Sequence, residues 1–185
     1  GGDGSDLIYY HGNESVDGGS GVDTLLVTKD ATAAVSIDGS TIKNIEVVTL
    51  AKDATAAIDA SSAGTALTIN GNAGATSIAG SASADVIYGG GGADSIAADA
   101  GDDFVEITNN FSAGVANGGA GSDTLSFGAA NDSITFSDAA ENLTIASKVG
   151  KTVAILNQIS NFEVYTGGAG NDTLDAASVT GGISL

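Results

Sequence analysis

A nine-residue period covers almost half of the chain, and it constrains the fold more than any other feature of the sequence. Residues 71–106 divide without remainder into four nonamers: GNAGATSIA, GSASADVIY, GGGGADSIA and ADAGDDFVE. The same frame begins again at residues 1, 18, 118, 127 and 167, and a weaker eight-residue version occupies residues 10–17. A short repeat of fixed length predicts a solenoid, in which each copy packs against the copies before and after it.

Two positions of the nonamer carry most of the information. The sixth residue is Asp in every copy except the one that has Thr76. The eighth residue is aliphatic in all nine copies: Ile8, Leu25, Ile78, Ile87, Ile96, Val105, Leu125, Ile134 and Leu174. One position therefore predicts a polar site that recurs along the solenoid, and the other predicts a continuous apolar core.

Each nonamer divides into a glycine-rich turn of six residues and a strand of three residues. Glycine allows the positive φ angles of the turn, and the middle residue of the strand points inward while its neighbours point outward. Two nonamers complete one coil, so residues that are 18 apart, such as Asp85 and Asp103, are expected to stack. We predict an all-β fold, a right-handed parallel β-roll or β-helix of roughly ten coils.

The stacked Asp residues predict a metal site. Parallel strands lie about 4.8 Å apart and Ca²⁺–oxygen distances are about 2.3–2.6 Å, so two stacked carboxylates can bracket one ion. The chain has no Cys and a single His, His11, so its ligands are oxygens, which favour Ca²⁺ over zinc or copper. Mg²⁺ fits less well, because it demands tighter octahedral geometry. The net charge of −18 also calls for bound cations.

Alternative roles for the Gly-Asp turns account for less of the pattern. Metal-free β-turns remain an alternative, but they do not require Asp at a fixed place in each copy. No EF-hand loop is present, because no D-x-[DN]-x-[DN]-G segment is closed by Glu at its twelfth position. The four glycines at 89–92 are not a phosphate-binding loop, since no Gly-Lys-Ser/Thr follows them.

The nonamers resemble the RTX (repeats-in-toxin) calcium-binding repeat, G-G-x-G-x-D-x-U-x, where U is a large aliphatic residue. The copies that start at residues 1, 18, 89, 118 and 167 match this pattern in full, whereas those at 71, 80 and 127 depart from it. The resemblance and the stacking together predict calcium as the bound ion. The expected ligands are Asp6, Asp23, Asp85, Asp94, Asp103, Asp123, Asp132 and Asp172, and the turn residues Gly1, Gly2, Gly4, Gly18, Gly19, Gly21, Gly89, Gly90, Gly92, Gly101, Gly118, Gly119, Gly121, Gly167, Gly168 and Gly170.

The segments between the nonamers look like further coils. We expect a single elongated solenoid over residues 1–185, a fragment of a longer protein, with RTX-type turns at 1–26, 71–106, 118–135 and 167–175 and calcium-poor strand ladders at 27–70 and 136–166. The hexamer KDATAA occurs at 29–34 and 52–57. A second echo pairs IKNIEVVT at 42–49 with ISNFEVYT at 159–166, and each follows a nonamer that begins GGxGxDTL.

Alternation of RTX turns with Thr- and Ala-rich ladders resembles bacterial surface-layer (S-layer) proteins and adhesins that are exported by type I secretion. The resemblance implies a secreted, cell-surface module with Ca²⁺-dependent folding and lattice self-assembly, and contact with surface polysaccharide through other regions. The alternative is the calcium-binding roll of a secreted RTX enzyme or an adhesin. We expect no catalysis within the chain, which lacks HExxH and G-x-S-x-G. The acidic charge disfavours nucleic acid, and no apolar run is long enough for membrane insertion.

Overall fold

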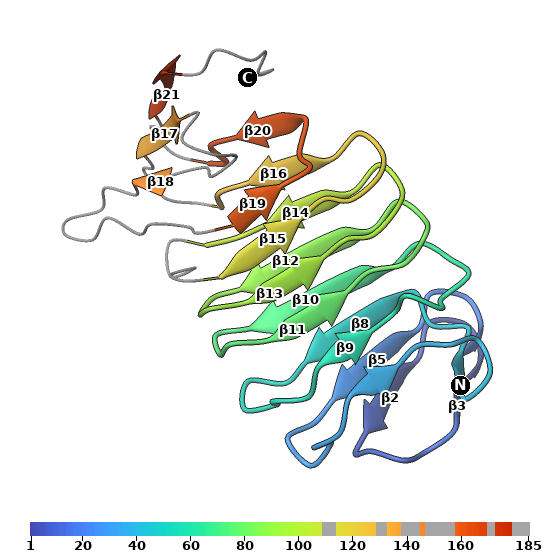
Figure 1. Ribbon diagram of the computed structural model, residues 1–185. Helices are drawn as coiled ribbons and strands as arrows, with labels where there is room; N and C mark the ends of the chain where they lie inside the picture. Colours follow the sequence, from blue (N-terminus) through green and yellow to red (C-terminus); the bar gives the residue numbers. More distant parts are fainter. Residues whose placement is uncertain (109–113, 129–132, 138–144, 147–157, 170–172, 179–185) are drawn as a thin grey trace.

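The computed structural model describes residues 1–108, 114–128, 133–137, 145–146, 158–169 and 173–178. Within these ranges the chain forms strands and turns and no helix, so none of the described residues belongs to a helix that could cross a bilayer. The strands stack into a solenoid whose coils rise from the N-terminal residues towards the C-terminal ones (Figure 1). The prediction of an all-β fold with parallel strands is confirmed.

One wall of the solenoid is an eight-stranded parallel sheet, here called the long sheet. Its strands, in spatial order, are β2 (Leu7–Tyr10), β5 (Thr24–Val27), β8 (Val47–Leu50), β10 (Thr68–Asn72), β12 (Val86–Gly90), β14 (Phe104–Glu106), β16 (Thr124–Ser126) and β20 (Val164–Thr166). The spatial order follows the chain order, because each strand pairs with the equivalent strand of the next coil.

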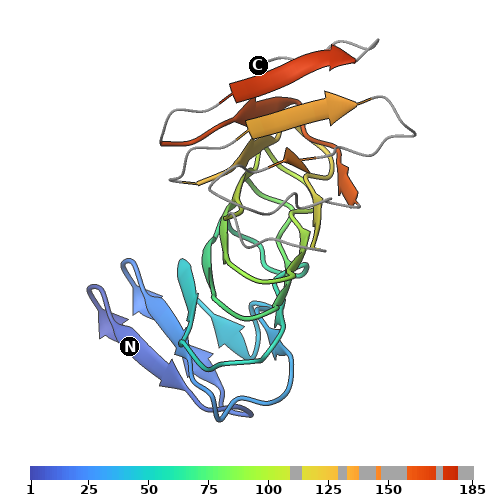
Figure 2. The same cartoon turned by 90° about the vertical axis from the view of Figure 1, so that its left-hand side faces the viewer.

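The second wall is a six-stranded parallel sheet, the short sheet. Its strands are β6 (Val35–Ser36), β9 (Ile58–Asp59), β11 (Ser77–Ala79), β13 (Ser95–Ala97), β15 (Val115–Asn117) and β19 (Gln158–Ser160). Two small pairs lie at the N-terminal end, β1 (Gly2–Asp3) with β4 (Gly19–Ser20) and β3 (Val16–Asp17) with β7 (Ile42–Lys43). Residues 27–70 thus contribute strands to both walls. Figure 2 shows the middle coils as loops stacked one above another.

The strand register reproduces the 18-residue coil in the block of contiguous nonamers. Ile69 pairs with Ile87, Ile87 pairs with Val105, and on the short sheet Ile78 pairs with Ile96. Elsewhere the coils are longer: Leu25 pairs with Val48, 23 residues on, and Leu125 pairs with Tyr165, 40 residues on. The described part therefore has eight long-sheet strands and fewer coils than the ten that a constant 18-residue coil predicts.

The eighth-position residues form the apolar core. Leu25, Ile87, Val105 and Leu125 are completely buried, and Ile78 and Ile96 are 1% exposed. Ile8 in the first coil is only partly buried, since no earlier coil covers it. Burial of one large aliphatic side chain contributes about 1.5–3 kcal/mol, so this ladder provides much of the stabilisation of the stack.

The C-terminal strands depart from the regular stack. β17 (Ser133–Ser137) pairs in parallel with β21 (Thr173–Ser178), which aligns Ile134 with Leu174, the eighth residues of their nonamers. β17 also pairs with β18 (Ile145–Ala146) in antiparallel orientation. Among the strand pairs of the described residues this is the only antiparallel one, and the repeat pattern did not predict it.

Candidate calcium sites in the turns

One column of side chains runs along the solenoid immediately before the long-sheet strands. The register of the sheet places these residues one above another, and all but one carry a carboxylate. The column, called here the carboxylate column, consists of Asp6, Asp23, Glu46, Leu67, Asp85, Asp103, Asp123 and Glu163. The corresponding places before short-sheet strands β11 and β13 hold Thr76 and Asp94.

Hydrogen bonds link successive members of the column. The backbone N–H of Asp85 donates to Oδ1 of Asp103 over 2.7 Å, and the N–H of Asp103 donates to Oδ1 of Asp123 over 2.9 Å. The N–H of Asp6 donates to Oδ1 of Asp23 over 2.8 Å. On the other wall the N–H of Thr76 donates to Oδ1 of Asp94 over 2.9 Å. Each of these bonds uses one carboxylate oxygen and leaves the second oxygen free for another interaction.

That second oxygen lies buried without a hydrogen-bond donor at five of the described Asp residues. The five atoms are Oδ2 of Asp6, Asp23, Asp94, Asp103 and Asp123. All but Asp6 are residues with at most 2% of their surface exposed. A buried carboxylate oxygen without a donor is costly, and a bound cation removes the cost. All five belong to the sixth position of a nonamer, so the atoms that lack partners recur with the period of the repeat.

Backbone carbonyls of the next coil converge on the same places. A Cβ at Gly18 would stand 2.6 Å from Oδ2 of Asp23 and nearer still to the carbonyl oxygen of Asn44. A Cβ at Gly1 would collide in the same way with Oδ2 of Asp6 and the carbonyl oxygen of Gly18. A side chain at the first position would therefore fill the space between two acceptor oxygens of neighbouring coils. Two acceptors without a donor between them fit a cation, and carboxylate and carbonyl oxygens are the ligands that Ca²⁺ prefers.

The second and fourth positions of the turn explain why the repeat begins with G-G-x-G. Gly19 has a φ of 109° and Gly21 has a φ of 133°, which L-residues with side chains rarely adopt. A Cβ at either residue would also collide with a carbonyl oxygen of the preceding coil, that of Gly2 or that of Gly4. Glycine therefore permits both the turn conformation and the close approach of adjacent turns.

Burial shifts the acid–base equilibria of these carboxyls. Loss of solvent raises the pKa of Asp94 to about 6, against a hydrogen bond from Thr76 that lowers it. The pKa of Asp103 is also raised to about 6, first by burial and then by the charges of Asp123 and Asp85. Burial likewise raises the pKa of Asp123. The charged forms of these groups are therefore disfavoured in the ion-free fold, and a cation would relieve the cost.

Asp85 differs from the other Asp residues of the column. Its Oδ2 accepts a hydrogen bond of 2.6 Å from the backbone N–H of Ser81, and its Oδ1 accepts one of 3.1 Å from the Ser81 hydroxyl. This copy has Ser and Ala where a full repeat has Gly. Both oxygens of Asp85 thus have donors within the protein, although the sequence predicted Asp85 as a ligand equal to Asp103. Its part in calcium binding stays a prediction.

The remaining predicted ligands divide between the turns and the parts of the chain outside the described residues. Asp132, Asp172 and Gly170 lie outside the described residues. Among the described residues no group of three or more Asp, Glu or His side chains converges on one point. Any ion in these turns would therefore take most of its ligands from backbone carbonyls, together with one or two carboxylates, as the stacking argument implies.

Glu46 and Glu163 are members of the carboxylate column that the nonamer frame did not predict as ligands. Oε2 of Glu46 accepts a hydrogen bond of 2.8 Å from the N–H of Asp23, and Oε2 of Glu163 accepts one of 2.7 Å from the N–H of Asp123. The signal in the sequence was the repeated N-[IF]-E-V segment, whose Glu directly precedes a strand as the sixth-position Asp does.

Comparison with protein families agrees with the geometry of the turns. The model of the RTX calcium-binding nonapeptide repeat (four copies) matches residues 70–105, 115–134 and 162–178. These ranges include the turns of Asp85, Asp94, Asp103 and Asp123. No curated protein is a significant match to the chain.

Proposed function

This chain belongs, through its nonapeptide repeats, to the RTX calcium-binding proteins, and we propose that it is a structural module of a bacterial surface layer whose folding and lattice self-association depend on Ca²⁺. Proteins with these repeats are typically secreted. The calcium-binding character of the repeats is a property of the family. The surface-layer role and the self-association are our proposal, and the following features of the molecule support them.

The charge distribution supports folding that depends on calcium. The chain carries 23 acidic and 5 basic residues, and much of the buried acid is concentrated in the carboxylate column. One ion at each of the five Oδ2 atoms without donors would move the net charge from −18 to about −8. Ligands that bind only the folded state stabilise it by mass action. Uptake of calcium would therefore both close the coils and reduce repulsion between chains.

The outer face of the long sheet supports self-association. The strand residues that flank the buried ladder include aliphatic, aromatic and Thr side chains, and only Glu106 among them is charged. They are Leu7, Tyr9, Thr24, Leu26, Val47, Thr49, Thr68, Asn70, Val86, Tyr88, Phe104, Glu106, Thr124, Ser126, Val164 and Thr166. Leu7 and Tyr9 are 55% and 58% exposed. Exposed apolar surface of this kind favours protein–protein contact once the acidic turns are neutralised.

We further propose that the chain acts without catalysis. Its close carboxylates are accounted for by metal ligation, and His11 is an exposed residue that contacts Glu14 at 3.6 Å. Partners other than the chain itself, including surface polysaccharide, would be bound by other regions of the protein. The competing function, a calcium roll attached to a secreted enzyme or adhesin, shares the calcium sites but does not need self-association.

Light scattering during a calcium titration distinguishes these two functions, with folding followed by circular dichroism. We expect particle mass to rise in the same calcium range in which β-structure forms. Tyr88→Lys should reduce association at least tenfold without changing the folding midpoint, because it places a charge on the outer face of the long sheet. Thr32→Lys adds the same charge at an exposed residue outside that face and serves as the control. Folding without association would favour the enzyme or adhesin module.

A further inference from the structure

The two N-[IF]-E-V segments, residues 44–47 and 161–164, occupy the same place relative to the nonamer turn of the preceding coil. Val47 pairs with Thr24 and Val164 pairs with Thr124, so Glu46 is level with Asp23 and Glu163 is level with Asp123. Each Glu accepts the backbone N–H of that Asp, over 2.8 Å and 2.7 Å respectively. This is the bond that Asp103 and Asp123 form with the Asp one coil earlier.

The Asn of each segment takes the place of the first residue of a nonamer. Asn44 has a φ of 53° and Asn161 has a φ of 55°, the left-handed conformation. A Cβ at Gly18 would collide with the carbonyl oxygen of Asn44, and a Cβ at Gly118 would collide with that of Asn161. In the complete repeats the carbonyl of the next first residue has this position, as Gly18 does for Gly1.

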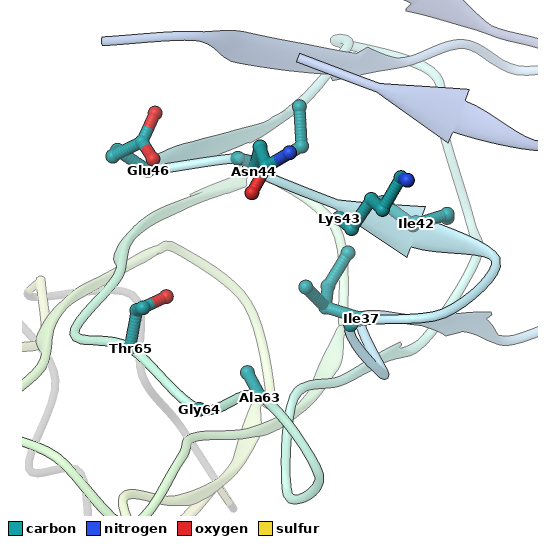
Figure 3. A pocket seen from close by; sticks show the side chains of 10 residues that line it. Ile37, Ile42, Lys43, Asn44, Glu46, Ala63, Gly64 and Thr65 are labelled. Carbon is teal, nitrogen blue, oxygen red and sulfur yellow. The ribbon is translucent and has the colours of Figure 1, made fainter. Parts of the chain in front are cut away.

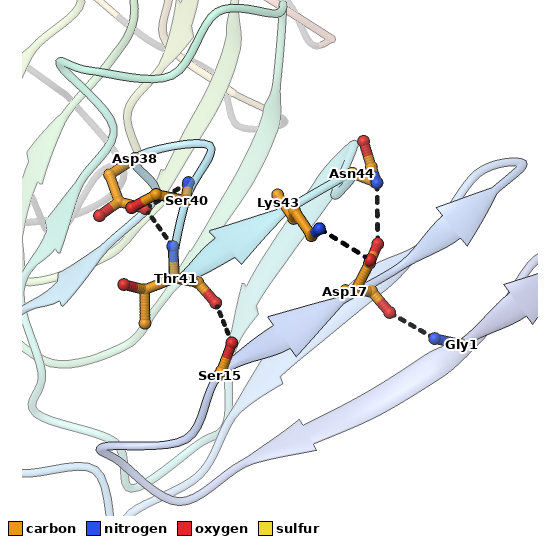
Figure 4. A network of polar contacts seen from close by, with 8 residues as sticks. All are labelled: Gly1, Ser15, Asp17, Asp38, Ser40, Thr41, Lys43 and Asn44. Carbon is orange, nitrogen blue, oxygen red and sulfur yellow. Dashed lines mark hydrogen bonds and ion pairs between the residues drawn. The ribbon is translucent and has the colours of Figure 1, made fainter.

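The same hydrogen bonds fix both Asn residues. The amide nitrogen of Asn44 donates 2.8 Å to Oδ1 of Asp17, and Lys43 forms an ion pair with Asp17 at 3.1 Å (Figure 4). The amide nitrogen of Asn161 donates 2.9 Å to Oδ1 of Asn117. Asp17 and Asn117 are the residues directly before the two nonamers. Two segments more than a hundred residues apart therefore make the same arrangement independently.

A carboxylate oxygen without a donor faces each segment. Asp23 and Asp123 are completely buried, and their Oδ2 atoms have no hydrogen-bond partner among the described residues. The same Cβ position at Gly118 that collides with the Asn161 carbonyl lies 2.7 Å from Oδ2 of Asp123. Oxygens of the Asp and of the Asn thus meet at the first glycine. Such a pair requires a cation, because neither atom can donate a hydrogen bond.

The Glu side chain suits the shorter segment. Five residues separate the first glycine of a nonamer from its Asp, whereas two separate Asn44 from Glu46. On its other side Glu46 borders a cavity of about 230 Å³ between its own coil and residues 63–65 (Figure 3). The next member of the column is Leu67, which has no carboxylate. The first run of stacked carboxylates therefore ends at Glu46.

We propose that residues 44–46 and 161–163 are shortened calcium turns, each of which completes a calcium site with the nonamer turn before it. The first site would use Oδ2 of Asp23, the carbonyl oxygen of Asn44 and the carboxylate of Glu46. The second would use Oδ2 of Asp123, the carbonyl oxygen of Asn161 and the carboxylate of Glu163. The proposal rests on the calcium-binding function, and it adds two ligands that lie outside the nonapeptide frame.

Calcium stoichiometry of the full chain, measured by equilibrium dialysis against millimolar Ca²⁺, tests this assignment. Glu46→Gln and Glu163→Gln keep an oxygen that can accept the Asp N–H but remove the negative charge. We expect each variant to lose one ion, or to bind one ion at least tenfold more weakly, and the double variant to lose two. Glu106→Gln removes the same charge from the outer face of a strand, away from the turns, and should bind like the wild type.

The outcomes separate this proposal from the general calcium function. Wild-type binding with Glu46→Gln and Glu163→Gln indistinguishable from Glu106→Gln would overturn the shortened turns alone. A wild-type chain that binds no calcium would overturn both. Crystals of the wild type grown in calcium give a test that does not depend on the folding of any variant. We expect anomalous peaks in contact with the Glu46 and Glu163 carboxylates, and their absence beside occupied nonamer sites would contradict the proposal.

Discussion

The backbone N–H of Asp85 donates a hydrogen bond of 2.7 Å to Oδ1 of Asp103, which lies one coil further along the solenoid. The bond fixes the register of two adjacent turns and turns the second oxygen of Asp103 into a buried site without a donor. Because Asp103 is linked in the same way to Asp123, it has a carboxylate neighbour on each side.

Asp103 is therefore the single residue whose loss should weaken calcium binding most. Asp103→Asn keeps an oxygen for the Asp85 N–H but removes one charge from the middle of the carboxylate column. We expect loss of at least one bound ion or a severalfold higher calcium midpoint, measured by titration calorimetry. Asp53→Asn, at an exposed residue outside the column, should leave both values unchanged. Equal effects of the two substitutions would show that the column is not the binding site.

The glycines of the turn provide a prediction about stability. Gly18→Ala places a Cβ against Oδ2 of Asp23 and the carbonyl of Asn44, and the loss should be at least about 2 kcal/mol. Gly64→Ala is the matched control, since a Cβ there meets nothing within 4 Å. It should be neutral or slightly stabilising, because alanine restricts the unfolded chain. Denaturant unfolding in excess calcium measures both, and a Gly18→Ala chain as stable as Gly64→Ala would refute the tight packing of the first position.

The core ladder predicts opposite results for two neighbouring residues of β12. Ile87 is completely buried, and Ile87→Ala should lower the free energy of unfolding by about 2–5 kcal/mol. Val86 is on the outward side of the same strand, and Val86→Ala should cost less than about 1 kcal/mol. Denaturant unfolding in calcium would show whether the eighth position faces the core, and similar losses at both residues would disprove the inward–outward alternation.

Acid should partly replace calcium in the folding of the chain. The pKa values of Asp94 and Asp103 are raised to about 6 in the ion-free fold, above the ordinary value of 3.8. The folded state thus binds protons more tightly than the unfolded state, so its stability is greatest below pH 4 and is lost as pH rises through 6. In chelator, we expect more β-structure by circular dichroism at pH 5 than at pH 7. Calcium affinity should fall over the same interval, because protons compete for the carboxylates.

A control for the acid effect is the Asp94→Asn, Asp103→Asn double variant. Its amides do not titrate, so its ion-free fold should depend less on pH between 7 and 5 than that of the wild type. An unchanged pH dependence in the double variant would place the relevant protons on other groups.

Much of the regular solenoid could be predicted from the sequence, because one residue type at one position determines each feature. Eighth-position residues such as Ile87 form the core, and Asp103 faces both Asp85 and Asp123 even though the second step is 20 residues long. The turns could be predicted because glycine and Asp recur at fixed intervals. These features depend on the strand register alone.

Other features depend on contacts that the nonamer frame does not encode. Ser81 supplies both donors to Asp85, and only the placement of its hydroxyl and N–H in the turn shows that. Glu46 joins the carboxylate column because β8 pairs with β5 across a coil of 23 residues, whose length the pattern did not indicate. The antiparallel pair of β17 and β18 likewise has no counterpart in the repeat.

Removal of calcium tests the central claim most directly, since the fold places donorless carboxylate oxygens at the sixth position of successive turns. Circular dichroism and small-angle X-ray scattering of the chain, recorded in chelator and again at millimolar Ca²⁺ near pH 7, provide the measurement. We predict an expanded chain with little β-structure in chelator and a compact, β-rich chain after calcium is added, with Mg²⁺ a poor substitute. A chain that remains compact and β-rich after exhaustive chelation would contradict the account.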